Sequence, residues 1–360
     1  MLESDGPGGA ETVVFQLAEE LRARGREVVP VGPEQGVGWL GDKFRAAGFT
    51  PEVFRLRRPL DWGCVRGLRA LFASRRIRAV HSHEFTMAVY GAMAARLSGL
   101  PHVVTMHGNQ SMTRALRRRI ALRWAFRSSR ATVAVSTATK TQLDADLALD
   151  PGVISVIRNG IPVRRGDPAP IRRELGVGPG EALILAVGNL DPRKGHMVLL
   201  RALARLDREG LAVPWRLAIA GGRGGPEREK LAAFAAEHGL AGRLSILAYR
   251  DDVPALQSAA EIFCMPSLWE GLPLAVLEAM FASSAIVASE TSGIPEAITD
   301  GREGLLVPPG DDLALAVALR RFLESPEERR AFGDRARRRA EAEFSIARMT
   351  DAYERLYAGG

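Results

Sequence analysis

The stretch IFCMPSLWEGLPLAVLEAM, residues 262–280, indicates the fold class of the chain. Its first four residues form an apolar run of strand length, and its last seven have the spacing of a buried helix. Pro273 suits the first turn of that helix, because its missing N–H would be unpaired there anyway. A buried strand followed at once by a helix is the unit of parallel sheets covered by helices, so the stretch predicts an α/β fold.

The same alternation of short aliphatic runs with helical patterns extends along the whole chain, which is typical of βαβ units. The predicted strands are 28–31, 79–83, 102–106, 131–135, 154–157, 182–187, 216–220, 244–247, 262–265, 285–288 and 304–307. Eleven buried strands exceed a comfortable single sheet, so we predict two doubly wound domains joined by the Pro/Gly/Arg-rich segment 162–170.

The domains are placed at residues 1–165 and 166–345, with a last helix within 346–360.

A predicted helix over 10–24 needs a preceding strand, yet only residues 1–4 stand before the glycine turn 6–9. We expect this first strand to be truncated; the alternative is a short edge strand. Because ligands of open α/β sheets bind beyond the carboxyl ends of the strands, functional residues are sought there.

Composition narrows the class of protein. With 46% hydrophobic and 25% charged residues the chain is an ordinary globular one, which excludes disorder and a collagen-like repeat. Cys64 and Cys264 form no disulfide framework or CxxC pair, which favours the cytoplasm. No apolar stretch approaches the roughly 20 residues that span a bilayer. We therefore predict a cytoplasmic protein that meets a membrane, if at all, on the inner surface.

The net charge of +7 is concentrated in the first half: residues 1–165 carry 25 Lys and Arg against 14 Asp and Glu. A predicted helix over 111–130 holds a basic stripe beside the apolar residues Leu116, Ile120 and Trp124; its members are Arg119, Arg123, Arg127 and Arg130. This stripe fits an anionic membrane surface or a pyrophosphate-bearing acceptor, and the alternative is a solvated face over an ordinary core contact. Aromatic residues at 6% and the lack of RNP, KH or zinc patterns argue against nucleic acid.

Two glutamates flank the start of the helix in residues 262–280. The free amides of a helix N-terminus form an anion site for phosphate. Glu270 precedes that end and Glu278 lies about a turn and a half inside, so their carboxylates are placed to accept hydrogen bonds from a sugar and a ribose. The alternative is a capping carboxylate and an exposed helical glutamate.

A second group, GNLDPRKGH at residues 188–196, follows another predicted strand. The chain has four lysines against 45 arginines, so Lys194 in a glycine-bounded loop suggests a need for a compact ammonium. Lysine binds phosphate as a point charge and the neighbouring Arg193 offers a fork. A solvated Arg-Lys pair is the alternative.

Three histidines close neighbouring predicted strands: His81, His83 and His107. With Glu84 beside them they are candidates for a metal site or for hydrogen bonds to a polar substrate. No HExxH or Asp-rich set accompanies them, so we favour hydrogen-bonding histidines and predict no metal.

Together these segments resemble the retaining nucleotide-sugar glycosyltransferases of family 4, and the resemblance extends over nearly the whole chain. The most specific part is the E-x7-E pair Glu270 and Glu278 within S-x-x-E-G-x-P-L-x-x-L-E-A-M. Further matches are Gly8-Gly9-Ala10-Glu11, His81-Ser82-His83, Thr105-Met106-His107-Gly108, Ile157-Arg158-Asn159-Gly160-Ile161, Gly188-Asn189-Leu190 with Lys194-Gly195, Gly221-Gly222, Gly293-Ile294-Pro295-Glu296 and Gly301-x-x-Gly304-Leu305-Leu306-Val307. The family implies the GT-B fold, with two Rossmann-like parallel-sheet domains facing a cleft and a C-terminal helix crossing back to the N-terminal domain.

The resemblance also implies roles for individual residues. Glu270 contacts the donor sugar, Glu278 the ribose, and His107 the sugar at the forming bond, while Lys194 neutralises the diphosphate. The implied binding set is completed by Gly8, Gly9, Asn189, Arg193, Gly222, Tyr249, Arg250, Gly271, Leu272 and Leu274. Many relatives have Gly-Arg-Leu where this chain has Asn189, so Arg193 is the candidate second cation. The common A-x-G-x-P is replaced by residues 281–285, FASSA, and a Gly-Gly by Ser292-Gly293.

The implied activity is transfer of a hexose from a nucleotide-diphosphate donor to a glycan or lipid-linked acceptor, with retention and without a metal or other cofactor. UDP is the favoured nucleotide and GDP the alternative. Such a reaction belongs to the synthesis of cell-surface polysaccharides or glycolipids. Two alternatives stay open: a catalytically weak or silent GT-B scaffold, and a sugar-nucleotide epimerase. The epimerase would need acid/base carboxylates from the first domain, for which the candidates are Asp5, Glu11 and Glu84.

Overall fold

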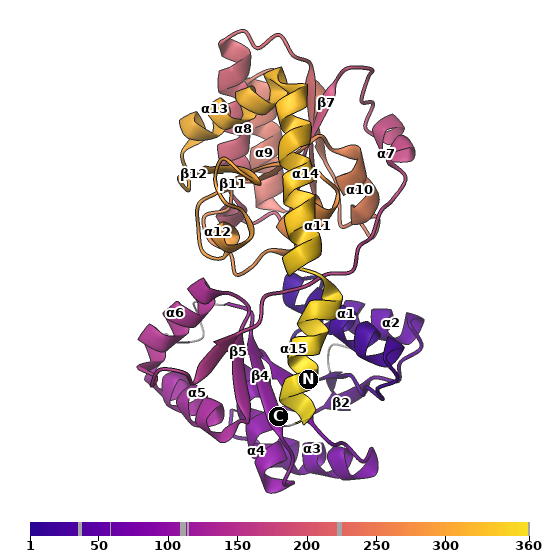
Figure 1. Ribbon diagram of the computed structural model, residues 1–360, viewed down its shortest axis with the longest axis vertical. Coiled ribbons are helices and arrows are strands. Elements are labelled where there is room, and N and C mark those ends of the chain that lie inside the picture. The colour runs from indigo at the N-terminus through magenta and orange to yellow at the C-terminus, as the bar shows by residue number, and fades with distance from the viewer. Residues whose placement is uncertain (35–37, 58, 109–112, 114, 222–224, 359–360) are drawn as a thin grey trace. The chain divides into compact units, whose positions relative to one another are not determined.

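A computed structural model describes residues 1–34, 38–57, 59–108, 113, 115–221 and 225–358. The chain divides into two compact units. Unit 1 comprises Met1–Pro162 with Ser345–Gly360, and unit 2 comprises Val163–Phe344. The division follows Pro162, slightly before the predicted residue 165. Both units are built on parallel strands, which confirms the predicted α/β class (Figure 1).

Unit 2 has a six-stranded parallel sheet in the order β12-β11-β10-β7-β8-β9. The strands are β7 (Ala182–Val187), β8 (Trp215–Ala220), β9 (Leu244–Ile246), β10 (Ile262–Met265), β11 (Ala285–Ser289) and β12 (Gly304–Val307). The central strands are buried along their length, as strands covered on both faces require. All six lie within one or two residues of the predicted runs.

Helices and short 3-10 turns connect these strands: α7 (Pro168–Glu174), η3 (Pro192–Lys194), α8 (His196–Arg208), α9 (Pro226–Glu237), η4 (Ala241–Arg243), α10 (Val253–Ala259), α11 (Leu274–Phe281), α12 (Ile294–Ala297), α13 (Asp312–Glu324) and α14 (Pro326–Glu343). The core between sheet and helices includes the fully buried Trp215, Phe322 and Leu203. Asp311 starts α13 as a side-chain cap, accepting from the amide of Ala314 at 2.9 Å. Figure 1 shows α14 as the long yellow helix of this unit.

Unit 1 contains two groups of parallel strands. One pairs β1 (Val31–Pro33) with β2 (Glu52–Phe54), and the other has the order β3-β4-β5-β6. The latter strands are β3 (Val80–His83), β4 (His102–Met106), β5 (Ala131–Ala134) and β6 (Ile154–Val156). β2 was not predicted, because its three residues have mixed polarity and only Phe54 is buried. The predicted strand 28–31 is shifted in the structure, where β1 begins at Val31.

The first two residues lie between these groups of strands. The N-terminal ammonium donates to the carbonyl of His81 at 2.7 Å, and the Met1 carbonyl accepts from the His83 amide at 2.9 Å. On the other side, the Leu2 amide donates to the Val31 carbonyl at 3.2 Å. The alternative of an edge strand is therefore wrong: this segment occupies an interior position between β1 and β3.

The helices of unit 1 are α1 (Gly9–Ala23), α2 (Trp39–Ala46), α3 (Trp62–Ser74), α4 (Glu84–Leu97), α5 (Leu116–Ser128), α6 (Thr137–Leu147) and α15 (Ile346–Ala358). α15 packs against α1 and β4, so the C-terminal helix belongs to unit 1 as predicted (Figure 1). Tyr353 on α15 is 1% exposed and its hydroxyl lies 3.0 Å from Oγ1 of Thr105 on β4. No helix of the described residues combines the length and apolar character needed to cross a bilayer.

Candidate functional site

The strand order of unit 2 places its candidate site. The chain runs outward from β7 to β8 and β9, then returns to β10 on the opposite side of β7. The loops that follow β7 and β10 therefore adjoin at the carboxyl ends of neighbouring strands. Such a switch point is where open α/β sheets bind their ligands. It brings together the two sequence groups that were singled out separately, 188–196 and 266–274.

These two loops touch through their backbones. The Leu268 amide donates to the Arg193 carbonyl at 2.7 Å. Gly195 has a φ of +68°, and a Cβ there would lie 1.9 Å from the carbonyl oxygen of Pro266. Only glycine combines this left-handed backbone with so close an approach. Gly195 thereby holds the preceding Lys194 beside the loop after β10.

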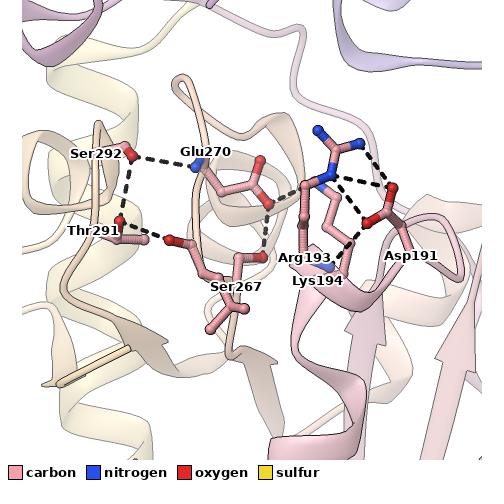
Figure 2. A network of polar contacts seen from close by, with 8 residues as sticks. Asp191, Arg193, Lys194, Ser267, Glu270, Thr291 and Ser292 are labelled. Atoms are coloured by element: carbon pink, nitrogen blue, oxygen red, sulfur yellow. Dashed lines mark hydrogen bonds and ion pairs between the residues drawn. The ribbon is translucent and has the colours of Figure 1, made fainter. Parts of the chain in front are cut away.

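Lys194 and Glu270 form an ion pair at this contact. The Lys194 ammonium lies 2.6 Å from Oε1 of Glu270, and Oγ of Ser267 donates to the same oxygen at 2.7 Å (Figure 2). Glu270 is 8% exposed, so its carboxylate is fixed in a largely desolvated position. An ammonium carries three N–H donors. Lys194 can therefore bind a second anion while Glu270 keeps it in place.

A third loop, following β11, supports Glu270 from its other side. The Glu270 amide donates to Oγ of Ser292 at 3.3 Å, and the Thr291 hydroxyl donates to the Leu268 carbonyl at 3.3 Å (Figure 2). Ser292 has a φ of +52°, a backbone region in which L-residues are strained. This support was not predicted from the sequence, where Ser292 was noted only as a replacement for glycine.

Arg193 points to Asp191, its neighbour in the same loop. Its guanidinium donates to both carboxylate oxygens, with Nη2 at 2.8 Å from Oδ2 (Figure 2). This contact lowers the pKa of Asp191 to about 2. The Arg193 side chain is 71% exposed. To act as a second cation that binds the phosphate, Arg193 must therefore release Asp191 and contact the ligand instead, or contact both at once.

The helix after β10 begins at Leu274, and Pro273, which was expected in its first turn, is its N-cap. The side chains of Leu272 and Leu274 are buried, so these residues and the half-buried Gly271 would offer a ligand their backbone. Glu278 lies one turn further along α11. Burial raises its pKa to about 7, an effect that the positive charge of Arg164 partly opposes.

The remaining predicted residues of unit 2 are placed as follows. The Tyr249 hydroxyl donates to Asp251 at 3.0 Å. Arg250 forms ion pairs with Asp252 and Glu174, at 2.7 and 2.9 Å for Nη2, so its guanidinium is already occupied by carboxylates. Asn189 is exposed, and Gly222 lies outside the described residues.

In unit 1, His107 follows β4 and lies beside His83, which ends β3, and Glu84, which follows it. Its Nε2 is 3.0 Å from Nδ1 of His83, and its amide donates to Oε1 of Glu84 at 2.9 Å. Burial lowers the pKa of His107 to about 4, so its imidazole is neutral at pH 7. The predicted proximity of His81, His83 and His107 is confirmed by ring centroid distances of 4.1 and 5.2 Å.

Gly8 and Gly9 lie at the start of α1 in the same unit. Gly8 is the N-cap, with an extended backbone, and Gly9 begins the helix. A Cβ on Gly8 would lie 2.3 Å from Oε2 of Glu11, so the missing side chain leaves room for that carboxylate. Within the described ranges, no three His, Cys, Asp or Glu side chains are grouped so as to hold a metal ion. The metal-independent reaction stays a prediction.

Comparison with known families agrees with this architecture. Residues 7–165 match the model described as glycosyltransferase family 4, and residues 168–339 match the model described as glycosyl transferases group 1. The chain is 32% identical over 310 residues to alpha-maltose-1-phosphate synthase of Mycobacterium tuberculosis, covering 78% of this chain and 79% of that protein. It is 26% identical to the Escherichia coli UDP-Gal:alpha-D-GlcNAc-diphosphoundecaprenol alpha-1,3-galactosyltransferase, over 97% of this chain and 93% of the relative.

Solved structures share the fold. The crystal structure of Anabaena HepE in complex with UDP superposes with a TM-score of 0.87 at 21% identity, covering 100% of this chain and 98% of that one. WaaG, a glycosyltransferase involved in lipopolysaccharide biosynthesis, superposes with a TM-score of 0.75 at 19% identity, covering 100% and 99%. The two-unit architecture, the matched family models and the relatives together establish that the chain belongs to the family 4 glycosyltransferases of the GT-B fold.

Proposed function

We propose that this protein transfers a hexosyl group, with retention and without a metal, from a nucleotide-diphosphate donor to a glycan or lipid-linked acceptor. The observation that carries the proposal is the Lys194–Glu270 ion pair at the switch point of unit 2. It joins a cation suited to phosphate with a carboxylate suited to sugar hydroxyls, beside the start of α11. UDP is the favoured nucleotide: HepE was crystallised with UDP, and the Escherichia coli relative is named for UDP-Gal.

The proposed donor site stabilises the leaving diphosphate by charge and by helix amides. Lys194 neutralises developing phosphate charge, and the amides that begin α11 donate hydrogen bonds to phosphate oxygens. Glu270 accepts hydrogen bonds from the sugar, and Glu278 accepts them from the ribose hydroxyls. The family resemblance implies that His107 contacts the sugar, and because its imidazole is neutral at pH 7, this role would add no positive charge.

In the proposed reaction the bond from the anomeric carbon to the diphosphate breaks, and a bond to the acceptor oxygen forms on the same face of the sugar. The acceptor hydroxyl proton passes to the departing phosphate oxygen, so no protein base is required. The oxocarbenium-like centre between these events is stabilised by the nearby diphosphate. Measuring the anomeric configuration of the product by NMR tests retention; an inverted product contradicts it.

Calorimetric titration tests the donor site. UDP, GDP and ADP are titrated in EDTA into the wild type, Glu278→Ala and Lys194→Ala. We expect one nucleotide to bind selectively, and each substitution to weaken it about tenfold or more, since each removes a charged hydrogen-bond partner. Glu237→Ala, on the last turn of α9, is the control that should leave binding unchanged. Absence of binding by all three nucleotides contradicts the proposal and favours a silent scaffold.

The acceptor is proposed to be lipid-linked or presented at an anionic membrane, and the surface of α5 supports this. Leu116, Ile120 and Trp124 recur every fourth residue and are 70%, 61% and 40% exposed. These three residues therefore make no core contact, whereas α5 packs on the core through Leu122, Ala125 and Phe126, which leaves the solvated basic face as the alternative. Arg119, Arg123 and Arg127 lie on the same helix, whereas Arg130 follows its end. Exposed apolar residues flanked by arginines suit a surface of anionic headgroups.

Co-sedimentation with vesicles of phosphatidylcholine and phosphatidylglycerol tests this membrane contact. The Arg119/Arg123/Arg127→Ser variant should no longer sediment with the vesicles. The Ile120→Ser/Trp124→Ser variant should also lose binding, although its charge is that of the wild type. The control Arg208/Arg330/Arg338→Ser removes the same charge from exposed positions of unit 2. Equal binding by all variants contradicts a membrane role for α5.

A further inference from the structure

Unit 1 has a switch point of its own. Met1 and Leu2 pair with β3 on one side and with β1 on the other, as described above. From them the chain runs outward through β1 to β2 and then returns to β3. The segments that follow Leu2 and β3 therefore adjoin at the carboxyl ends of neighbouring strands, in the same relation as the loops after β7 and β10. Ligands bind at such positions in open α/β sheets.

Glu84 occupies this switch point with an unusual backbone and a buried carboxyl group. It follows β3 directly, has a φ of +63° and is 8% exposed. Oε1 accepts the His107 amide at 2.9 Å, whereas Oε2 is buried and has no hydrogen-bond partner among the described residues. A buried polar atom without a partner costs stability in the protein alone, so its presence points to a ligand that supplies the hydrogen bond.

The surroundings of Glu84 are acidic. Burial raises the pKa of Glu84 to about 7, and the charges of Glu3 and Glu11 act in the same direction. Glu11 lies in the first turn of α1, where Gly8 leaves room for its carboxylate. The carboxyl group of Glu84, with the negative charges of Glu3 and Glu11 acting on it, disfavours a phosphate or carboxylate and favours hydroxyl groups, which donate hydrogen bonds without negative charge.

We propose that Glu84 binds a hydroxyl group of the acceptor in unit 1, and that this part of the acceptor is a neutral sugar or polyol. The inference rests on the proposed glycosyl transfer and deepens it by naming the acceptor chemistry. Oε2 of Glu84 accepts a hydrogen bond from the hydroxyl group, while Oε1 keeps its hydrogen bond from the His107 amide, which fixes the carboxyl group. Any anionic portion of a lipid-linked acceptor then lies away from Glu84, towards basic surface such as α5.

Ligand-observed saturation-transfer NMR tests the proposal with defined probes. Methyl α-D-glucopyranoside is the neutral probe and glucose 1-phosphate the anionic one, each measured with the full chain in the presence and absence of UDP. The variants are Glu84→Gln, which exchanges one oxygen for an amide of similar shape, and Glu84→Asp, which withdraws the carboxyl group by one methylene. Glu27→Gln, an exposed residue of the same unit, is the control for lost charge.

We expect saturation transfer to the neutral glycoside and a weaker signal for glucose 1-phosphate. Glu84→Gln and Glu84→Asp should weaken glycoside binding about five- to tenfold, because each removes one hydrogen bond to a charged group. Glu27→Gln should leave glycoside binding unchanged. Absence of a glycoside signal, equal signals in wild type and Glu84 variants, or preference for the phosphate overturns the proposal. UDP titration and the melting temperature of each sample show separately whether the variants fold and whether the donor-site proposal stands.

Discussion

At the scale of single residues, two serines adopt a backbone that favours glycine. Ser283 and Ser292 have φ values of +62° and +52°. They stand where the family's A-x-G-x-P and Gly-Gly patterns have glycine, so the departures noted in the sequence cost conformational strain. Ser292 offsets part of that cost, because its hydroxyl accepts the Glu270 amide. For Ser283 the structure gives no side-chain hydrogen bond among the described residues.

Ser283→Gly is therefore expected to stabilise the protein by about 1 kcal/mol, since the relieved left-handed strain exceeds the entropy that glycine adds to the unfolded chain. Ala282→Gly is the matched control: Ala282 is right-handed helical at the C-cap of α11, so glycine there should destabilise the protein by up to about 1 kcal/mol. Urea denaturation measures both. Destabilisation by Ser283→Gly contradicts the assigned strain.

Glu278 gives a pH-dependent prediction. Its pKa of about 7 means that the carboxyl group gains charge as pH rises through neutrality. A carboxylate accepts hydrogen bonds from ribose hydroxyls more strongly than a carboxylic acid does. Nucleotide affinity should therefore rise several-fold from pH 6 to pH 8 in the wild type. Calorimetry on Glu278→Gln provides the reference, because the nucleotide phosphate also titrates in this range; an unchanged pH profile in that variant contradicts the role of Glu278.

At the scale of elements, the candidate site depends on how closely the loops after β7 and β10 approach. Gly195 permits that approach, and the buried end of β10 fixes the opposite loop. The close approach of the two loops arises because Gly195 lacks a Cβ where the other loop places the Pro266 carbonyl. Displacing the β7 loop would move Lys194 away from Glu270.

Gly195→Ala should consequently destabilise unit 2 by about 3 kcal/mol and abolish nucleotide binding, because a Cβ would overlap the Pro266 carbonyl and meet an unfavourable φ. Gly180→Ala separates the two causes. Gly180 has a φ of +75°, and no atom lies within 4 Å of the position that its Cβ would take, so only the backbone strain of about 1 kcal/mol applies. Equal losses of melting temperature in the two variants would show that the close approach is unimportant.

At the scale of the whole molecule, buried histidines and buried glutamates have opposite effects on how stability changes with pH. Five of the six histidines have a pKa lowered by burial: His81, His83, His102, His107 and His196. Below pH 6.5 these histidines bind fewer protons in the folded state than in the unfolded state. The stability gained from keeping them neutral is therefore lost as the pH falls. Glu84 and Glu278, with a pKa of about 7, act in the opposite direction, reducing stability as pH rises from about 4.5 to 7.

The histidines outnumber these two glutamates, so the free energy of unfolding should fall on acidification from pH 6.5 to pH 5. Each net proton taken up on unfolding contributes about 1.4 kcal/mol per pH unit. Four of the five histidines belong to unit 1, whose strands should lose protection first. Hydrogen exchange across this range measures the effect; faster exchange in β7 and β8 than in β3 and β4 contradicts the assignment.

Much of this architecture could be predicted from local patterns. The strands of unit 2 follow from apolar runs, because a strand buried on both faces is apolar along its length. β2 escaped prediction because only one of its three residues, Phe54, is buried. The basic helix was placed over 111–130, whereas α5 spans Leu116–Ser128, so Arg130 falls outside it. Local periodicity reports burial and says little about helix ends.

The α/β class, the division into two parallel-sheet units, the family and most of the residues that carry the proposed chemistry could be predicted from the sequence, because apolar periodicity and short motifs are local properties. The ion pair of Lys194 with Glu270 was not predictable from local patterns, and neither was the hydrogen bond from the His107 amide to Glu84, although Glu84 was expected beside the histidines. Both contacts depend on which strands pair: β10 returns beside β7, and β4 pairs with β3. Residues tens of positions apart become neighbours there, because parallel strands bring all their carboxyl ends to one edge of the sheet.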